Sequence, residues 1–361
     1  MLPNQSVLAI GLMSGTSMDG IDVALIETNG ENVVRSRAFL TIPYQPTFRA
    51  SLAQAVAAGH ADAALEQDLT RRHAEAVRSL LAEAKVSARN IAVIGFHGHT
   101  VFHAPAERRT VQIGDGALLA RLTGLAVVND FRSADVAAGG EGAPLAPVFH
   151  RAITASLRKP VAVLNIGGVA NLTWIGENEA LLAFDTGPGN ALIDDWALTH
   201  TGTPVDKDGA LAAAGRVDDG VLAALMADPY FARRPPKSLD RNHFRNAATR
   251  VGALSAEDGA ATLTAFTAAA VADASEHLPV QVTEWLVTGG GRRNPVLMRA
   301  LGTRLAAPVR AIEAIGWNGD AIEAQAFAYM AVRSRNGLSI SFPETSGVPK
   351  PMTGGRLHKP N

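Results

Sequence analysis

The chain has 361 residues, of which 47% are apolar and 19% charged, and its formal net charge is −1. This length favours two domains, the composition argues against global disorder, and the near-neutral charge gives no reason to expect nucleic acid or a membrane as partner. There is no cysteine, which excludes a disulfide framework and a Cys-based zinc site. Because no basic leader or membrane-length apolar run is visible either, we expect a soluble cytoplasmic protein.

Two apolar runs, residues 7–12 and 21–26, flank a turn of Gly, Ser, Thr and Asp and predict a β-hairpin with a polar tip. Glycines let the backbone approach a ligand, hydroxyl and N–H groups bind phosphate oxygens, and Asp19 and Asp22 can hold Mg²⁺ directly or through water. An ordinary hairpin turn uses the same residue types, so this turn alone leaves both interpretations open. It is not a P-loop, because no Gly-Lys-Ser/Thr follows. The candidate phosphate and magnesium residues of this turn are Gly15, Thr16, Ser17, Met18, Asp19, Gly20, Ile21 and Asp22, with Asp19 as the metal ligand.

The pattern after the hairpin predicts an α/β domain with a mixed sheet. We expect a strand at 33–42, an amphipathic helix at 61–84, a buried strand at 91–96, a helix at 114–122 and a strand at 126–128. The last two strands end in polar motifs, His97-Gly98-His99-Thr100 and Asn129-Asp130.

A Gly-, Ala- and Pro-rich stretch at 131–147 indicates the passage between two lobes. The pattern then restarts with strands at 161–166, 169–175 and 181–184, separated first by Gly167-Gly168. This order repeats the opening of the first half, which indicates an internal duplication supported by layout rather than residue identity. We therefore expect an N-terminal lobe at 1–135, a C-terminal lobe at 136–319, a helix at 320–340 that returns to the first lobe, and an irregular tail at 341–361.

Within the second half, residues 204–246 look loop-rich and contain the basic run Arg233-Arg234-Pro235-Pro236-Lys237, for which we find no role. Ser255, with Asp258 three residues later, predicts the start of a helix that runs to about residue 277. A strand at 285–287 then leads into a third glycine-rich turn, and we expect a helix at 296–305, a strand at 309–312 and a helix at 320–333.

Three glycine-rich turns thus stand at strand ends, in an order that fits a nucleotide clamp. One turn in each duplicated lobe can surround phosphates with backbone N–H groups, while an acid carries the metal. Consecutive glycines in the third turn leave room for a flat base and ribose. The candidate residues for phosphate in the second lobe are Gly167, Gly168, Gly187, Gly189 and Asn190, and those for adenosine are Gly289, Gly290, Gly291 and Asn294.

The order of these motifs resembles that of the sugar kinase, Hsp70 and actin superfamily. Within it the chain resembles the anhydro-N-acetylmuramic acid kinase family from about residue 7 to residue 332. The resemblance rests on Gly11-Leu12-Met13-Ser14-Gly15-Thr16-Ser17-Met18-Asp19-Gly20, Phe96-His97-Gly98-His99-Thr100, Asn129-Asp130-Phe131-Arg132, Asn165-Ile166-Gly167-Gly168-Val169-Ala170-Asn171, Phe184-Asp185-Thr186-Gly187-Pro188-Gly189-Asn190 and Trp317-Asn318-Gly319-Asp320. It implies an α/β fold of two duplicated ribonuclease H-like lobes, with mixed sheets flanked by helices in an actin-like ATPase architecture with an interlobe cleft.

The resemblance also implies a double reaction with ATP and Mg²⁺. Water opens the 1,6-anhydro ring of the sugar while the 6-oxygen takes the γ-phosphoryl group, which gives N-acetylmuramic acid 6-phosphate and ADP in peptidoglycan recycling. In this family the base is the Asp of the second phosphate motif, here Asp185, and a carboxylate at a strand end suits that role. The sequence does not separate this role from one in holding Mg²⁺.

The sugar carries a lactyl carboxylate, for which Arg132 is our candidate, because arginine binds carboxylates in a bidentate manner. The other candidate sugar contacts are Ser14, His97, Asp185 and Glu323, although His97 and Glu323 also fit purely structural or solvent-facing positions. His99 and His103 have the spacing of metal ligands on a helix, but Pro105 and the preceding strand argue against a helix there, so we expect no transition metal.

Two alternatives remain open: a kinase for another sugar or a small carboxylate, and an ATP-switched binding protein like Hsp70 or actin. A switch protein usually carries a partner-binding domain, and none is visible after Ser341. The resemblance implies a homodimer, with the amino sugar and ATP as small-molecule partners.

Overall fold

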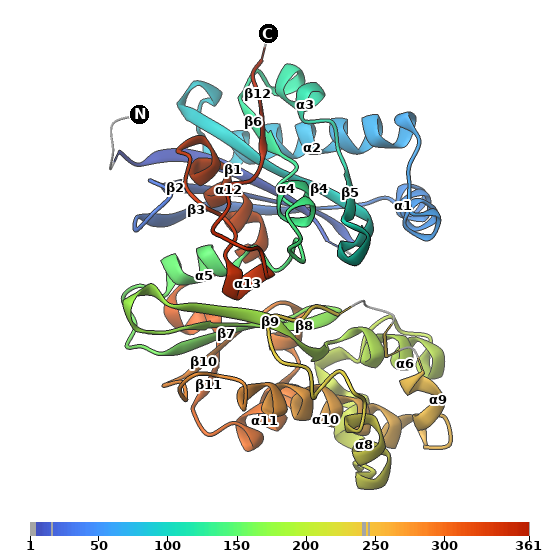
Figure 1. The fold of residues 1–361 in the computed structure, drawn as a ribbon. Helices are drawn as coiled ribbons and strands as arrows, with labels where there is room; N and C mark the ends of the chain where they lie inside the picture. The colour runs from blue at the N-terminus through green and yellow to red at the C-terminus, as the bar shows by residue number, and fades with distance from the viewer. Residues whose placement is uncertain (1–4, 16, 240–242, 245, 361) are drawn as a thin grey trace. The chain divides into compact units, whose positions relative to one another are not determined.

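The computed structural model describes residues 5–15, 17–239, 243–244 and 246–360. The chain forms two compact units, one of Met1–Ser156 with Ala321–Asn361 and one of Leu157–Asp320 (Figure 1). The segment 136–156, which we expected in the second lobe, therefore belongs to the first unit.

The first unit is built on a mixed sheet of seven strands in the order β12-β6-β4-β1-β2-β3, with β5 paired to β4. The predicted hairpin is confirmed, because β1 and β2 are antiparallel and join across the polar turn. The strands are β1 Val7–Ser14, β2 Gly20–Thr28, β3 Val34–Pro43, β4 Ile91–Ala104, β5 Arg109–Ile113, β6 Val127–Asn129 and β12 Arg356–His358.

Helices cover both faces of this sheet. Alternate β1 residues such as Ile10 and Leu12 pack in one apolar core with α2. The opposite face meets α12, whose backbone lies directly on the sheet: a Cβ at Gly11 would lie 1.7 Å from the Ala324 carbonyl oxygen. The helices of this unit are α1 Pro46–Ala58, α2 Ala63–Ala84, α3 Gly116–Thr123, α4 Ser133–Ala137, α5 Pro147–Ile153, α12 Ile322–Arg335 and α13 Pro343–Ser346, with short 3₁₀ turns η1 Ala88–Asn90 and η2 Pro105–Glu107.

The second unit has a five-stranded sheet in the order β11-β10-β7-β8-β9. Its strands are β7 Val161–Ile166, β8 Val169–Ile175, β9 Leu181–Pro188, β10 Trp285–Thr288 and β11 Val309–Ala311. The helices and 3₁₀ turns are α6 Ala191–Thr201, α7 Ala210–Ala214, α8 Asp219–Met226, α9 Ala247–Val251, α10 Ala256–Ser275, α11 Pro295–Arg304, η3 Glu177–Glu179, η4 Lys207–Gly209, η5 Gly290–Arg293 and η6 Ile312–Ile315. The α10 helix contributes to two apolar cores, one with the sheet and α11 and one with α6, α8 and α9.

The two sheets share one strand order, which confirms the predicted duplication and fold class. In each sheet the first three strands form an antiparallel meander, and the first strand also pairs in parallel with the fourth. The fourth strand in turn pairs in parallel with one further strand, β6 in the first unit and β11 in the second. The ends of β1 and β7 therefore occupy equivalent positions in their units, and each is followed by a glycine-rich turn.

Three sequence expectations were wrong in detail. The strand predicted to end at residue 96 continues to Ala104, because it pairs with β5 as a hairpin. The segment 204–246, expected to be loop-rich, contains α7 and α8. The tail after residue 341 contains α13 and β12, and β12 completes the sheet edge by pairing with β6.

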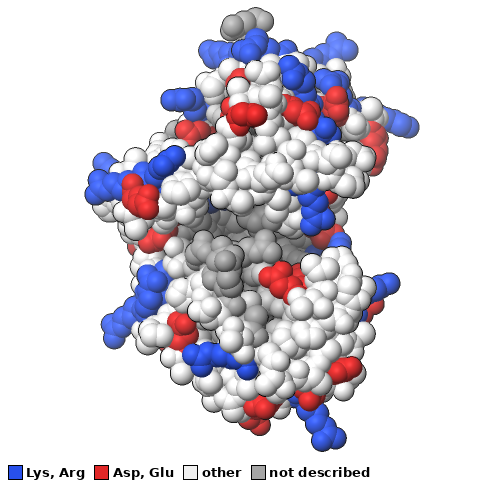
Figure 2. All heavy atoms as spheres, turned by 90° about the vertical axis from the view of Figure 1, so that its right-hand side faces the viewer, with Lys and Arg blue, Asp and Glu red and all other residues white. Residues whose placement is uncertain are grey.

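Two further observations concern the helices and the surface. Within the described part of the chain, no helix is both long and apolar enough to cross a membrane. On the face drawn in Figure 2, basic and acidic side chains are interspersed, and neither sign covers a broad area.

Candidate functional site

The polar turn between β1 and β2 is accessible to a ligand and is held in place by backbone hydrogen bonds. Met18 takes a left-handed backbone conformation with φ 53°, and its N–H donates to the Gly15 carbonyl at 3.0 Å. The turn is tied to its surroundings by Tyr44 N–H, which donates to the Asp19 carbonyl at 2.9 Å. Among the described residues, a Cβ at Gly15 would meet the Ser17 hydroxyl alone, at 3.6 Å, so the backbone here is accessible to a ligand. Thr16, another predicted phosphate contact, lies outside the described residues.

The carboxylates of this turn provide oxygen ligands of the kind that Mg²⁺ prefers. Asp19 is exposed, and its Oδ1 accepts a hydrogen bond from the Ser17 hydroxyl at 2.7 Å. Asp22 accepts a hydrogen bond from Thr41 at 2.6 Å. Mg²⁺ in phosphoryl-transfer sites is usually held by one or two carboxylates, water and the phosphates, so these residues fit the ion. Among the residues placed in the structure, no group of three or more acidic or histidine ligands forms a denser metal site.

Gly20 and Ile21, also predicted here, lie at the start of β2. A Cβ at Gly20 would lie 2.5 Å from the Ile42 carbonyl oxygen, so β3 requires glycine at this position. The Ile21 side chain is 1% exposed and packs in the core. Ile21 therefore offers a ligand its backbone alone.

Ser14, the last residue of β1, lies in a buried hydrogen-bond chain. Tyr44 donates to the Ser14 hydroxyl at 2.8 Å, and that hydroxyl lies 2.9 Å from His99 Nδ1. Burial raises the pKa of Tyr44 and lowers the pKa of His99 to about 4, so both groups are neutral near pH 7. The Ser14 hydroxyl therefore connects Tyr44 with His99. His99 lies on strand β4 and not on a helix, as Pro105 and the preceding strand indicated.

His97, Arg132 and Glu323 lie together beside the middle of β4. Arg132 Nε donates to His97 Nε2 at 3.0 Å, and His97 Nδ1 is 3.0 Å from the Gly98 carbonyl, so both ring nitrogens are engaged. The Phe327 ring packs on His97 at 4.6 Å, and Glu323 lies one helical turn before Phe327. Burial lowers the pKa of Arg132, and the negative charges of Glu323 and Asp135 oppose this effect. Burial and the Arg132 charge together keep the pKa of His97 well below its ordinary value.

The loop after α4 fixes the Arg132 guanidinium. Its Nη1 donates to the Gly142 carbonyl at 2.7 Å, and Gly142 N–H donates to Asp135 at 2.7 Å. Asp135 is buried and also accepts from Ser346 at 2.6 Å. These bonds engage Nε and Nη1 of Arg132 and hold the plane of the guanidinium.

Asp185 lies on edge strand β9 of the second unit and is held on several sides. Its Oδ2 accepts from Leu239 N–H at 2.8 Å. Its backbone N–H donates to the Lys237 carbonyl at 3.0 Å, and its backbone carbonyl accepts from Tyr230 at 2.6 Å. The carboxylate therefore has a defined orientation two residues before Gly187, where the glycine turn of β9 begins.

The glycine turns of the second unit form one continuous structure. Asn190 N–H donates to the Gly167 carbonyl at 2.7 Å, and Gly189 N–H donates to the Gly168 carbonyl at 3.0 Å. A Cβ at Gly189 would lie 2.2 Å from the Gly167 oxygen, so only glycine permits this contact. The third turn adjoins it, since a Cβ at Gly290 would lie 3.4 Å from the Asn190 amide nitrogen. Gly187, Gly289 and Gly291 complete this group: Gly187 lies beside α10, and the other two lie beside Ile166.

Residues around the third turn have mainly structural contacts. Asn294 caps α11, accepting from the N–H groups of Val296 and Leu297. Arg292, which sequence analysis did not single out, donates to the Gly289 carbonyl at 3.0 Å and pairs with Asp320 at 2.9 Å. This arginine therefore connects the Trp317–Asp320 motif to the glycine turn.

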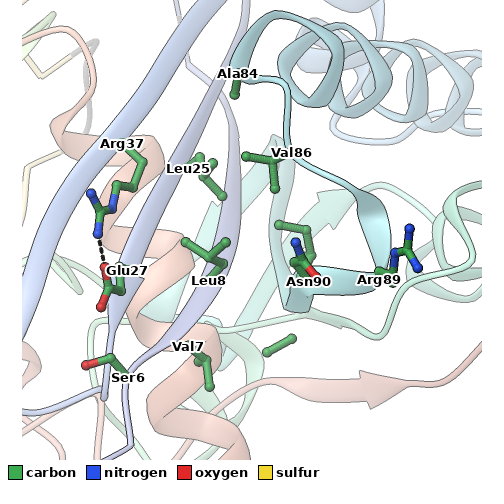
Figure 3. Close-up of a pocket in the computed structure, with 12 residues that line it drawn as sticks. Ser6, Val7, Leu8, Leu25, Glu27, Arg37, Ala84, Val86, Arg89 and Asn90 are labelled. Atoms are coloured by element: carbon green, nitrogen blue, oxygen red, sulfur yellow. Dashed lines mark hydrogen bonds and ion pairs between the residues drawn. The ribbon is translucent and has the colours of Figure 1, made fainter.

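A cavity of about 750 Å³ in the first unit lies away from these residues (Figure 3). It lies near the start of β1, at the opposite end of that strand from Ser14, with Leu8, Leu25 and Val86 on its apolar side and the Glu27–Arg37 ion pair at its edge. None of the predicted site residues lines it.

A model of the family described as anhydro-N-acetylmuramic acid kinase matches residues 7–359. The chain belongs to the anhydro-N-acetylmuramic acid kinase family. Proteins of this description from Paramagnetospirillum magneticum and Rhizorhabdus wittichii are 59% and 56% identical to it; each match covers 98% of this chain, with 100% and 99% of the relative. The chain is thus a kinase, a phosphotransferase that uses ATP, as the sequence motifs predicted.

Among solved structures, component A of the Acidaminococcus fermentans (R)-2-hydroxyglutaryl-CoA dehydratase is similar over 91% of this chain and 99% of its own, with a TM-score of 0.50. Its sequence identity is 13%, so this likeness concerns the fold alone.

The structure thus groups the predicted residues within each unit. In the first unit, Ser14 at the end of β1 and the polar turn that follows it form one group. His97, Arg132 and Glu323 form a second group. In the second unit, Asp185 and the glycine turns form a third group. Sequence analysis missed Tyr44, Tyr230 and Leu239, because each acts through a contact between segments far apart in the chain, and no local motif marks them.

Proposed function

We propose that this kinase opens 1,6-anhydro-N-acetylmuramic acid with water and phosphorylates its O6, giving N-acetylmuramic acid 6-phosphate and ADP in peptidoglycan recycling. The water oxygen bonds to C1, the C1–O6 bond breaks, and O6 attacks the γ-phosphorus as ADP leaves. The proton of the attacking water passes to a carboxylate. Membership of the family and relatives with this name support the substrate.

The observation that carries the mechanism is the fixed carboxylate of Asp185. Leu239 N–H donates to one of its oxygens at 2.8 Å, and the residue lies on β9 two residues before Gly187, in a turn suited to phosphate. A general base must be oriented toward the proton it removes, which a carboxylate anchored in this way achieves. We assign Asp185 as the base that activates water.

Other residues bind and orient the two substrates. Backbone N–H groups of the turns at Gly15–Gly20 and Gly187–Asn190 contact phosphate oxygens, and those at Gly289–Gly291 face the adenosine. Arg132 binds the lactyl carboxylate. His97 affects sugar binding indirectly, because its Nε2 accepts a hydrogen bond from Arg132 Nε and so orients the guanidinium. Glu323 accepts from a sugar hydroxyl.

The proposed reaction also uses a magnesium ion. Asp19, directly or through water, would hold the ion, with Asp22 as the neighbouring carboxylate. When bound, Mg²⁺ neutralises charge on the phosphates during transfer. The family resemblance also suggests a cytoplasmic homodimer, for which sedimentation of the purified protein is the direct measurement.

The deciding experiment is an ADP-release assay with Mg-ATP, comparing 1,6-anhydro-N-acetylmuramic acid with N-acetylmuramic acid, glucose and acetate. The sugar phosphate is then analysed after reaction in ¹⁸O-labelled water. We expect turnover on the anhydro sugar alone, with label at C1. Turnover on glucose or acetate instead would indicate a different kinase. Slow ATP hydrolysis without any acceptor would favour an ATP-switched binding protein.

A further inference from the structure

The segment from Tyr230 to Leu239, which contains the basic run that matched no motif role, runs along the edge of the sheet next to Asp185. Strand β9 is the last strand in its sheet, and it pairs with β8 on one side. On its other side, Asp185 N–H donates to the Lys237 carbonyl. The segment therefore contacts β9 at the residue assigned as the base.

Tyr230 anchors the first end of this segment. Its side chain is 2% exposed, and its hydroxyl donates to the Asp185 carbonyl at 2.6 Å. The ring packs among aromatic side chains, with Phe231 at 5.9 Å and Phe244 at 6.2 Å between ring centroids. These ring contacts fix the direction in which the hydroxyl points.

Lys237 connects the later part of the segment to its beginning by hydrogen bonds. It is 2% exposed, and its Nζ donates to the carbonyls of Tyr230 and Phe231, each at 3.3 Å. The ammonium also lies 4.6 Å from the centre of the Tyr230 ring and 5.8 Å from that of Phe184, the residue before Asp185. Burying an ammonium is unfavourable unless it is compensated, and here carbonyl oxygens and aromatic faces supply the compensation.

We propose that Tyr230 and Lys237 are positioning residues that orient the Asp185 carboxylate for water activation. Neither touches a substrate. Tyr230 fixes the backbone of Asp185, and Lys237 holds the segment so that the Leu239 N–H meets Oδ2. This inference rests on the proposed function, because it assigns these residues to the same reaction.

The test uses Tyr230→Phe, which keeps the ring and removes the hydroxyl. Its matched control is Tyr329→Phe, since the Tyr329 hydroxyl, equally buried, donates to the Glu31 carbonyl at 2.7 Å in the first unit. We expect both variants to lose similar thermal stability. Tyr230→Phe alone should lower kcat for the anhydro sugar about tenfold, with KM for sugar and ATP within twofold, because misorientation of a base affects the chemical step.

A second pair tests the lysine. Lys237→Met should lower kcat about tenfold or more at unchanged KM, whereas Arg234→Met, which removes an exposed charge from the same basic run, should leave kcat unchanged. If Lys237→Met does not fold, the tyrosine pair decides.

The wild-type enzyme is measured in the same assay, which separates the two proposals. Absence of wild-type turnover on the anhydro sugar would overturn the proposed function. An active wild type with equal kcat in Tyr230→Phe and Tyr329→Phe would overturn the positioning role. A loss confined to KM would indicate that the segment acts in binding instead, and would likewise reject it.

Discussion

At the scale of single residues, Asp185 is distinguished by how completely its surroundings fix it. Backbone and carboxylate are both hydrogen-bonded to the segment that ends at Leu239. Such anchoring sets the direction of the remaining lone pairs, which is what proton removal from a bound water requires.

Asp185→Asn removes the basic oxygen while keeping an acceptor for the Leu239 N–H. We expect kcat to fall by about 10²–10⁴-fold, the usual contribution of a general base, with nearly normal binding of ATP and sugar. Steady-state kinetics and calorimetric binding measure the two effects. Weakened nucleotide binding with substantial residual turnover would instead identify Asp185 as a residue that organises Mg²⁺.

Arg132→Ala tests the lactyl carboxylate site. Loss of a charge-assisted hydrogen bond costs about 1.5–3 kcal/mol, so KM for 1,6-anhydro-N-acetylmuramic acid should rise about 10–100-fold. An analogue without the lactyl group, 1,6-anhydro-N-acetylglucosamine, should show a much smaller effect. Arg121→Ala, at an exposed position on α3, is the control. An equal change for both sugars would remove Arg132 from the carboxylate site.

At the scale of elements, α12 decides the packing of the first unit. It contacts β1, β2 and β4 at once and is buried over nearly its whole length. Glycines on two of these strands permit the approach. A Cβ at Gly95 would lie 2.0 Å from the Phe327 carbonyl oxygen, and a Cβ at Gly11 would lie 1.7 Å from the Ala324 carbonyl oxygen. This contact also brings Phe327 and Glu323 to His97 and Arg132.

Gly11→Ala should therefore destabilise the first unit by at least about 3 kcal/mol, because the strand and helix backbones must move apart. The matched control is Gly302→Ala in α11, where no atom lies within 4 Å of the new Cβ. This substitution should stabilise the protein by about 0.5–1 kcal/mol through helix propensity. Urea unfolding of both variants measures the difference, and equal stabilities would contradict the close packing.

At the scale of the whole molecule, one unit carries a set of buried neutral histidines. Burial lowers the pKa of His73 and His99 to about 4 and that of His150 to about 3, and His97 also titrates well below its ordinary range. All four belong to the first unit. The unfolded chain binds protons at these positions near pH 6.5, whereas the folded chain does not, so stability falls as the pH drops below about 6.5.

We expect the first unit to lose stability between pH 7 and pH 5, by about 2 kcal/mol for each such histidine. His73→Leu should make this loss smaller by about that amount, whereas His60→Leu, at an exposed position, should leave it unchanged. Chemical denaturation at both pH values, followed by hydrogen exchange to assign the unit, provides the measurement. An identical pH dependence of the wild type and His73→Leu would show that His73 does not titrate in this way.

The sequence by itself determined the fold class, the duplicated layout, the family and the candidate residues of each turn. These features are local: glycine turns after apolar strands, a polar hairpin tip, and the Ser255 cap that accepts from Asp258 N–H at 3.0 Å. Residue order within a motif is sufficient to express them, which is why Gly15, Asp185 and Gly189 could be named in advance.

Only the tertiary structure decided which distant residues support those candidates. Tyr44 and His99 form hydrogen bonds with Ser14, and Tyr230 and Lys237 form hydrogen bonds with Asp185. The two residues joined by each of these bonds are 30 to 85 positions apart in the chain. Strand β12 and the length of β4 were likewise set by pairing with other strands. Such contacts depend on packing of elements that no local pattern specifies, because their free energy arises only after the sheet and helices have assembled.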